Sequence, residues 1–175
     1  MKKKFPVRKL VFAGVLAALS MVLSLYPFTF YLTDSIRVTF REVPILLCAF
    51  LLGPWYAAGC AFAADLIGTL VTGLGWYPPL TVPAVLFAIL AGVLAKLLES
   101  RLRPLFRISV STIVANLFCP ILLTTAILSH LYGTPYGALI AVRGPLYACL
   151  LTIQIILVRF LLPPLTKLFQ MEKRA

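Results

Sequence analysis

Charged residues are scarce in this sequence. Only 12% of its 175 residues are charged, about half the share of a typical soluble domain. It contains five acidic residues and one histidine, which excludes a metal site built from several histidines. It has no GxxxxGK[ST], HExxH or GxSxG motif, the signatures of a P-loop, a zinc protease and a serine hydrolase. We therefore expect no enzymatic activity, and no cofactor or metal bound by this chain.

Cysteine is also rare, and nothing in its spacing indicates a metal site. Cys48, Cys60, Cys119 and Cys149 lie inside apolar runs, without CxxC or Cys/His spacing, so we predict core residues rather than metal ligands or disulfides. The net charge of +11 comes from basic residues near the ends of the apolar runs. There they set the orientation of a membrane protein and contact anionic lipid head groups. This placement argues against a nucleic-acid partner.

Apolar residues are abundant instead: 62% of the chain is hydrophobic and the mean hydropathy is +1.03. Apolar runs of about 18 or more residues can cross the roughly 30 Å core of a bilayer as helices. The first run, residues 10–28, follows a cluster of lysines and arginines. A cleaved signal peptide is the alternative reading, but bulky residues at 27–31 continue the run where a cleavage site needs small ones. We predict a retained span.

The apolar block from Val43 to Val71 decides the number of spans. As one tilted helix, it gives five spans and puts the basic residues of 96–107 outside. If Gly53-Pro54 is a tight inner turn, there are six spans and these basic residues join the N-terminal lysines in the cytoplasm. The enrichment of basic residues on the cytoplasmic side favours six, and Pro54 suits the first position of a helix.

The predicted protein is thus one all-α membrane domain, residues 1–175, in the plasma (inner) membrane of a prokaryote. Six transmembrane helices are expected at about 9–27, 40–52, 54–72, 80–98, 108–131 and 136–162. Both termini and the 99–107 connection should be cytoplasmic, while 30–40 and 73–79 face outward. The second span is short, and non-helical backbone at membrane depth must be buried or line a cavity. We therefore expect residues 28–40 to fold over the mouth of the bundle.

Ionisable side chains inside a bilayer are costly and mark candidate functional sites. At about 1.5 Å of rise per residue, Asp65 and Arg143 each lie roughly 10 Å below the outer ends of their spans. Thr124 and Thr125 fall in the same layer, and Tyr147 lies one turn deeper. We predict a binding site in the outer half of the bundle. The alternative is that Asp65 and Arg143 only pair with each other and hold the helices together.

Further candidates lie at the outer ends of the spans. Arg37 and Arg41, in the first outer segment, run against the distribution expected of basic residues, which favours a role in recognition. Trp76 and Tyr77 stand at an outer boundary, where they would either stack on a ligand or belong to an interfacial aromatic belt.

Small residues recur on the first span. Ala13 and Ala17 share one face and Gly14 and Ala18 share another, because residues four apart are neighbours on a helix. Small side chains let a second helix, or lipid, approach closely. These four residues are therefore candidates for a partner-docking face.

Several segments match a known family. They are IRVTFREVP at 36–44, FLLGPWYAAGCAFAADLIGTL at 50–70 and GLGWYPPLTVPAVLFAILAGVL at 73–94. With the face at Ala13 and Ala17, Arg143 and the six-span plan, the chain resembles the S components of energy-coupling-factor (ECF) vitamin transporters over most of residues 10–165. The folate (FolT-like) branch is the most similar. At Thr124-Thr125 and Pro79-Leu80 this sequence differs from the residues expected in that branch. These differences affect the prediction of the substrate more than the prediction of the family.

The resemblance implies a subunit that captures folate, or a reduced folate, outside and delivers it inward with a transmembrane T component and two cytoplasmic ATPases, which would use the ATP. An S component for another vitamin or precursor, such as pantothenate or a queuosine precursor, is the first alternative. An accessory membrane protein without a ligand is the second. Arginine would bind folate carboxylates, Asp65 the N–H edge of the pterin, and Trp76 and Tyr77 would stack on its rings. The predicted substrate-binding set is Arg37, Arg41, Asp65, Trp76, Tyr77, Thr124, Thr125, Arg143 and Tyr147.

Overall fold

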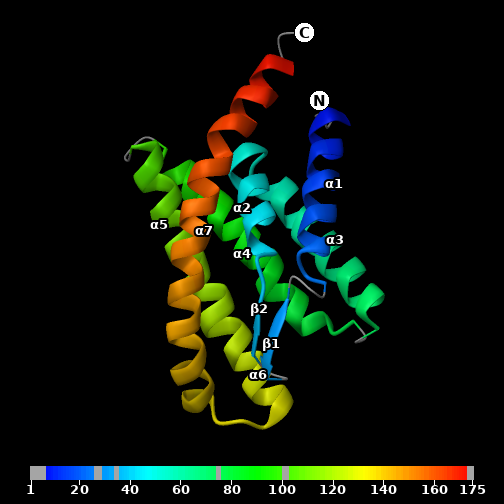
Figure 1. Cartoon of the computed structure of the whole chain (residues 1–175), viewed down its shortest axis with the longest axis vertical. Helices are drawn as coiled ribbons and strands as arrows, with labels where there is room; N and C mark the ends of the chain where they lie inside the picture. The colour runs from blue at the N-terminus through cyan, green and yellow to red at the C-terminus, as the bar shows by residue number, and fades with distance from the viewer. Residues whose placement is uncertain (1–6, 26–28, 34–35, 74–75, 100–102, 173–175) are drawn as a thin grey trace.

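The computed structural model describes residues 7–25, 29–33, 36–73, 76–99 and 103–172, which form a helical bundle with one β-hairpin (Figure 1). The elements are α1 (Val7–Val22), β1 (Phe30–Thr33), β2 (Ile36–Val38), α2 (Glu42–Leu51), α3 (Pro54–Thr72), α4 (Pro78–Leu97), α5 (Pro104–Asn116), the π-helical segment η1 (Leu117–Leu123), α6 (Thr124–Tyr132) and α7 (Tyr136–Glu172). Helix α1 begins and α7 ends at the same end of the bundle, and the hairpin and α6 lie toward the opposite end (Figure 1).

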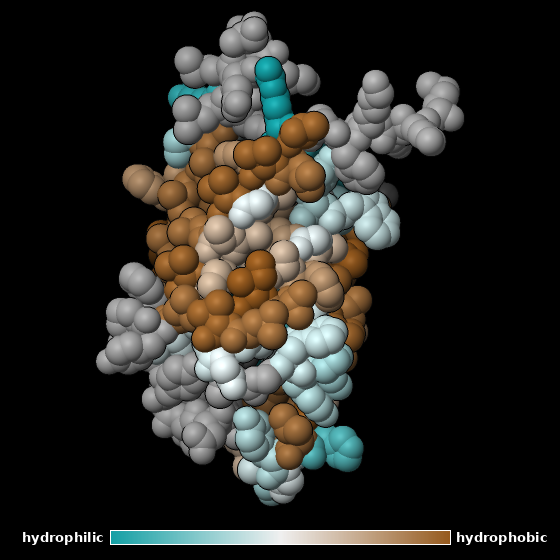
Figure 2. All heavy atoms as spheres, turned by 90° about the vertical axis from the view of Figure 1, so that its right-hand side faces the viewer, coloured by the Kyte–Doolittle hydropathy of each residue, from teal (hydrophilic) through white to brown (hydrophobic). Residues whose placement is uncertain are grey.

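The helices have the length and composition of a membrane protein. In the described part of the chain, four stretches are long and apolar enough to cross a bilayer: Pro54–Thr72, Pro78–Leu97, Phe106–Tyr132 and Tyr136–Lys167. Figure 2 shows hydrophobic side chains covering the middle of the face formed by α1 and α3. The all-α membrane class predicted from the sequence is confirmed, whereas the number of spans and the side of each terminus stay predictions.

Helix α2 lies at the centre of the bundle and packs against α1, α3, α4 and α7. Its side chains are almost inaccessible, with Ile45 1%, Leu46 0% and Cys48 0% exposed. At 10 residues, it covers only about half of a roughly 30 Å bilayer core. The hairpin and the residues between it and α2 extend from the start of α2 toward the opposite end of the bundle (Figure 1). Glu42, the first residue of α2, therefore lies deep in the bundle.

The turn between α2 and α3 is fixed by two glycines. Gly53 has a φ of 104°, which glycine adopts without steric cost, and Pro54 begins α3. Gly92 of α4 passes so close that a Cβ added to it would lie 2.8 Å from the Pro54 Cα. The backbone of α4 is therefore packed directly against the backbone of this turn.

Two helix ends differ from the sequence-based expectation. Helix α1 ends at Val22 rather than near residue 27, because the Ser24 N–H bonds to Met21 O, three residues back, and the α-helical pattern stops. Helix α7 continues to Glu172, past residue 162 and through Pro163-Pro164. Each proline removes one backbone donor, and the rest of the helix continues around them. Of the cysteines, three are buried as predicted, but Cys149 is exposed.

Residues 104–132 form one continuous but irregular helix. Pro120 lacks an N–H, and its ring clashes with the carbonyl four residues back in a regular α-helix. The chain widens here into a π-helical turn, in which the Thr124 N–H bonds to Cys119 O, five residues back. Single π turns inside helices are frequent at functional sites. Both Pro120 and Thr124 line the cavity described next.

Candidate ligand-binding site

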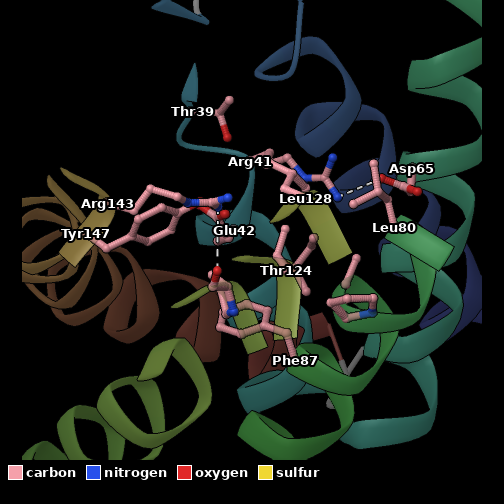
Figure 3. A pocket seen from close by; sticks show the side chains of 14 residues that line it. Thr39, Arg41, Glu42, Asp65, Leu80, Phe87, Thr124, Leu128, Arg143 and Tyr147 are labelled. Carbon is pink, nitrogen blue, oxygen red and sulfur yellow. Dashed lines mark hydrogen bonds and ion pairs between the residues drawn. The ribbon is translucent and has the colours of Figure 1, made fainter. Parts of the chain in front are cut away.

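A cavity of about 90 Å³ lies where α2, α3, α4, α6 and α7 converge beneath the end of the hairpin (Figure 3). Phe87 and Leu80 from α4 and Leu128 from α6 give the lining apolar surface. The lining also includes ionisable groups of both signs. The lining residues are Thr39, Arg41, Glu42, Ile45, Asp65, Leu80, Pro83, Ala84, Phe87, Pro120, Thr124, Leu128, Arg143 and Tyr147.

Asp65 joins three elements at one edge of the cavity. Its Oδ1 accepts a hydrogen bond from Arg41 Nη2 at 2.8 Å, and its Oδ2 accepts one from Thr81 Oγ1 at 2.6 Å. Trp76 Nε1 in turn donates to Thr81 Oγ1 at 2.9 Å. The Asp65 side chain is 6% exposed, so its charge is balanced by a guanidinium and a hydroxyl rather than by water.

Arg143 lies on the opposite side of the cavity, and not all of its hydrogen-bond donors have an acceptor in the described part of the chain. The residue is 4% exposed, and its Nη2 donates to Tyr147 Oη at 3.1 Å, with Cζ 5.2 Å from the centre of the Tyr147 ring. A second contact, from Nη2 to Pro120 O, is long at 3.5 Å. Its Nε and Nη1 have no hydrogen-bond partner among the described residues. A buried cation with unused donors is costly, and an anionic group of a ligand would satisfy it.

Glu42 supplies a second carboxylate to the cavity. It begins α2, where a negative side chain is favoured by the positive end of the helix dipole. Its Oε2 accepts a hydrogen bond from Gln154 Nε2 of α7 at 3.0 Å. The cavity therefore contains two acids, Glu42 and Asp65, and two bases, Arg41 and Arg143, which matches a ligand with both an anionic group and N–H donors.

The structure brings five of the nine predicted binding residues to this cavity: Arg41, Asp65, Thr124, Arg143 and Tyr147. Thr125 is fully buried but does not line the cavity. Trp76 and Tyr77 are 43% and 41% exposed and also lie outside the lining, so the structure shows neither ring stacked into the cavity. Arg37 has its backbone in β2, and its side chain lies outside the part of the structure that is described.

Sequence reasoning missed Thr39, Thr81 and Glu42. For Glu42 a signal was present, since the sequence has only five acidic residues and this one opens an apolar run. The suggested pairing of Asp65 with Arg143 is wrong, because Asp65 pairs with Arg41. Depth along a helix follows from residue number, but the direction of a side chain around the helix axis depends on how the helices pack.

The small residues of α1 divide between two faces. Ala13 and Ala17 are 6% and 8% exposed and belong to the hydrophobic core of this chain, where α1 packs on α2 and α3. Gly14 and Ala18 are exposed, and a Cβ added to Gly14 would meet no atom within 4 Å. The expected docking face therefore narrows to Gly14 and Ala18, because a partner helix cannot reach the two buried alanines.

Comparison with known proteins identifies the class. Residues 8–162 match the family model described as "ECF transporter, substrate-specific component". The match covers most of the chain, so the protein belongs to this family. It is a substrate-binding membrane subunit of a transporter, and the S components of this family work with a T component and ATPases.

Solved structures agree with this assignment. The structure of FolT bound with folic acid is 25% identical, with a TM-score of 0.75 over 89% of this chain and 93% of that chain. The S component for biotin from an ECF-type ABC transporter has the same TM-score of 0.75 at 16% identity, over 95% of both chains. The curated uncharacterized protein MG313 of Mycoplasma genitalium is 32% identical over 84 residues, which cover 48% of this chain and 29% of that protein.

Proposed function

We propose that this chain captures folate, or a reduced folate, at the outer face of a prokaryotic plasma membrane. The observation that carries the proposal is Arg143, a buried guanidinium that lines the cavity with Nε and Nη1 unpaired within the described structure. Folates end in a glutamate with carboxylates, and arginine binds carboxylates through paired, charge-assisted hydrogen bonds. The likeness to FolT bound with folic acid supports the same substrate.

The apolar residues among the cavity lining suit the aromatic part of such a ligand. Phe87 offers a ring face, and Leu80 and Leu128 offer apolar surface. A vitamin-sized site measures roughly 300 Å³ or more, whereas this cavity has about 90 Å³. Binding folate therefore requires the cavity to widen. Thr39 lines it just after the hairpin, so the hairpin is the element whose movement would open it.

Biotin is the second candidate, because the biotin S component matches with the same TM-score. Like folate, biotin has ring N–H groups at one end and a carboxylate at the other. Both would place the carboxylate on Arg143. Folate is larger and has aromatic rings, whereas biotin has none, and the competition experiment described below separates them.

Delivery inward would depend on a T component and two ATPases. Gly14 and Ala18 of α1 leave room for the close approach of a partner helix. They stand among exposed apolar side chains of the same helix: Val11, Val15, Leu19 and Val22. We infer that this strip is where the T component docks.

A competition experiment on the purified full-length chain tests the substrate. Bound labelled folic acid would be challenged in turn with unlabelled folic acid, 5-formyltetrahydrofolate, biotin, pantothenate and a queuosine precursor. We expect displacement by the two folates only. Displacement by biotin or pantothenate, or no retention of folic acid at all, would reject folate as the substrate.

A further inference from the structure

The two hydrogen bonds that Arg143 makes within the described structure share one nitrogen. Nη2 donates to Tyr147 Oη at 3.1 Å and, over a longer distance of 3.5 Å, to the Pro120 carbonyl. Each terminal nitrogen of a guanidinium carries two hydrogens, so both hydrogens of Nη2 are directed at the protein. Nε and Nη1 have no partner among the described residues. One nitrogen is thus held by the protein, and the donors of the other two remain for a ligand.

The π turn explains why the Pro120 carbonyl is within reach. In a regular α-helix, the carbonyl of residue 120 would accept from the N–H of residue 124. Here the Thr124 N–H bonds to Cys119 O instead, and the Thr124 hydroxyl donates to the same oxygen at 3.2 Å. The Pro120 carbonyl therefore does not receive that N–H, and it contacts the Arg143 guanidinium of α7.

Tyr147 supplies the shorter of the two contacts. It lies four residues after Arg143 on α7, so the two side chains are neighbours on one face of the helix (Figure 3). Arg143 Cζ lies 5.2 Å from the centre of the Tyr147 ring, within the range of a cation–π contact. Because both residues belong to α7, this contact does not depend on how α7 packs against its neighbours.

We propose that Tyr147 is a positioning residue, which holds Nη2 of Arg143 and leaves Nε and Nη1 to bind a carboxylate of the substrate. The inference rests on the proposed function and deepens it, because Tyr147 acts through Arg143 rather than by touching the ligand. A guanidinium held in one orientation loses less freedom when a ligand binds, so more of its hydrogen bonding appears as affinity. Tyr147 therefore strengthens the preference for a carboxylate over an uncharged amide of the same shape.

The test compares two ligands that differ in charge. Affinities of the purified full-length chain are measured by calorimetry for folic acid and for its diamide, in which amides replace both carboxylates of the glutamate. The wild type should prefer folic acid by roughly 10- to 100-fold, because charge-assisted hydrogen bonds are stronger than neutral ones.

Three variants measure the contribution of Tyr147 to this preference. Tyr147→Phe keeps the ring but removes Oη, and it should lower the preference roughly 3- to 10-fold, the worth of one hydrogen bond. Tyr147→Met removes the ring as well and should lower the preference further. Tyr136→Phe is the matched control, because Tyr136 is on the same helix, 39% exposed and outside the cavity lining. The control should keep the preference of the wild type.

A double variant separates positioning from direct contact with the ligand. In an Arg143→Met background, Tyr147→Phe should change the affinity for neither ligand, because the side chain that it positions is gone. If Tyr147→Phe still weakens folic acid in that background, Tyr147 acts by another contact and the inference is overturned. An unchanged preference in both Tyr147→Phe and Tyr147→Met, or equal weakening of the two ligands, would overturn it as well.

The wild type alone distinguishes failure of this inference from failure of the proposed substrate. Binding of folic acid and its diamide with equal affinity would overturn the role of Arg143 and Tyr147 while folate stands. If folic acid does not bind, biotin and biotin amide take their place. A preference for biotin that Tyr147→Phe lowers would reject folate but support Tyr147, and binding of neither vitamin would reject both.

Discussion

Arg41 and Asp65 form an ion pair at the edge of the cavity, with Arg41 Nη2 2.8 Å from Asp65 Oδ1 and side chains 15% and 6% exposed. The pair joins the residue just before α2 to the middle of α3. Thr81 adds α4 to the same junction. Because Asp65 is used in this way, Arg143 keeps its charge for another partner.

The first prediction concerns the stability that this pair provides. Asp65→Ala should lower the free energy of unfolding by about 3 kcal/mol or more, because Arg41 is left as a largely buried charge without a partner. The double variant Asp65→Ala with Arg41→Met should recover much of the loss, because neither charge remains. Thermal unfolding of the two single variants and the double variant in detergent measures both effects.

An exposed ion pair provides the control. Arg107 Nη1 lies 3.2 Å from Glu99 Oε1, and the Glu99 side chain is 69% exposed. Glu99→Ala should cost at most about 1 kcal/mol, as exposed pairs do. If Asp65→Ala costs no more than Glu99→Ala, the pair at the cavity has no special structural role.

The second prediction concerns ligand binding. Arg143→Met should cost about 2 to 5 kcal/mol of binding free energy, because the carboxylate of the ligand would be left buried without its partner. Arg159→Met is the matched control on the same helix, since Arg159 is exposed and its Nη2 donates to Ser109 Oγ at 2.9 Å, away from the cavity lining. Affinity for folic acid measures the difference. Unchanged affinity in Arg143→Met would contradict the role given to this residue.

The third prediction separates docking from folding on α1. Gly14→Trp and Ala18→Trp should bind ligand normally, because both positions are exposed, but should lose ATP-dependent uptake and co-purification with the T component. Ala13→Trp should instead lower the melting temperature, because Ala13 is 6% exposed and a large side chain overpacks the core. Wild-type uptake by both Gly14→Trp and Ala18→Trp would show that the partner docks elsewhere.

The fourth prediction tests the close approach of α4 to the α2–α3 turn. Gly92→Ala should destabilise the protein by about 1 to 3 kcal/mol, because the new Cβ would lie 2.8 Å from the Pro54 Cα. Gly59→Ala is the control, as its Cβ would meet no atom within 4 Å. That change should be neutral or slightly stabilising, because alanine favours a helix interior over glycine. Equal melting temperatures of the two variants would argue against a tight crossing.

The fifth prediction concerns topology. In a Cys149→Ser background, Tyr77→Cys should react with a membrane-impermeant maleimide added to intact cells, and Glu99→Cys should react only after the cells are opened. Six spans with cytoplasmic termini require this pattern. The opposite pattern would favour a different arrangement of the spans.

The amino-acid sequence alone determined the class of this protein and the common layer in which three of its cavity residues lie. Low charge and long apolar runs leave helices as the only way to satisfy backbone amides in lipid. The uniform rise of a helix then places Asp65, Thr124 and Arg143 in one layer, and all three line the cavity. The motifs around Gly53-Pro54 pointed to the family that the comparisons confirm.

Only the tertiary structure decided which side chains meet. Rise along a helix axis does not say which way a side chain points around it, so packing chose Arg41 rather than Arg143 as the partner of Asp65. Packing likewise buried Ala13 while leaving Gly14 exposed. Glu42 and Gln154 are 112 residues apart in sequence, and their contact depends on α7 lying against α2. Local spacing carries no information about such a contact, because it is created by the helices coming together.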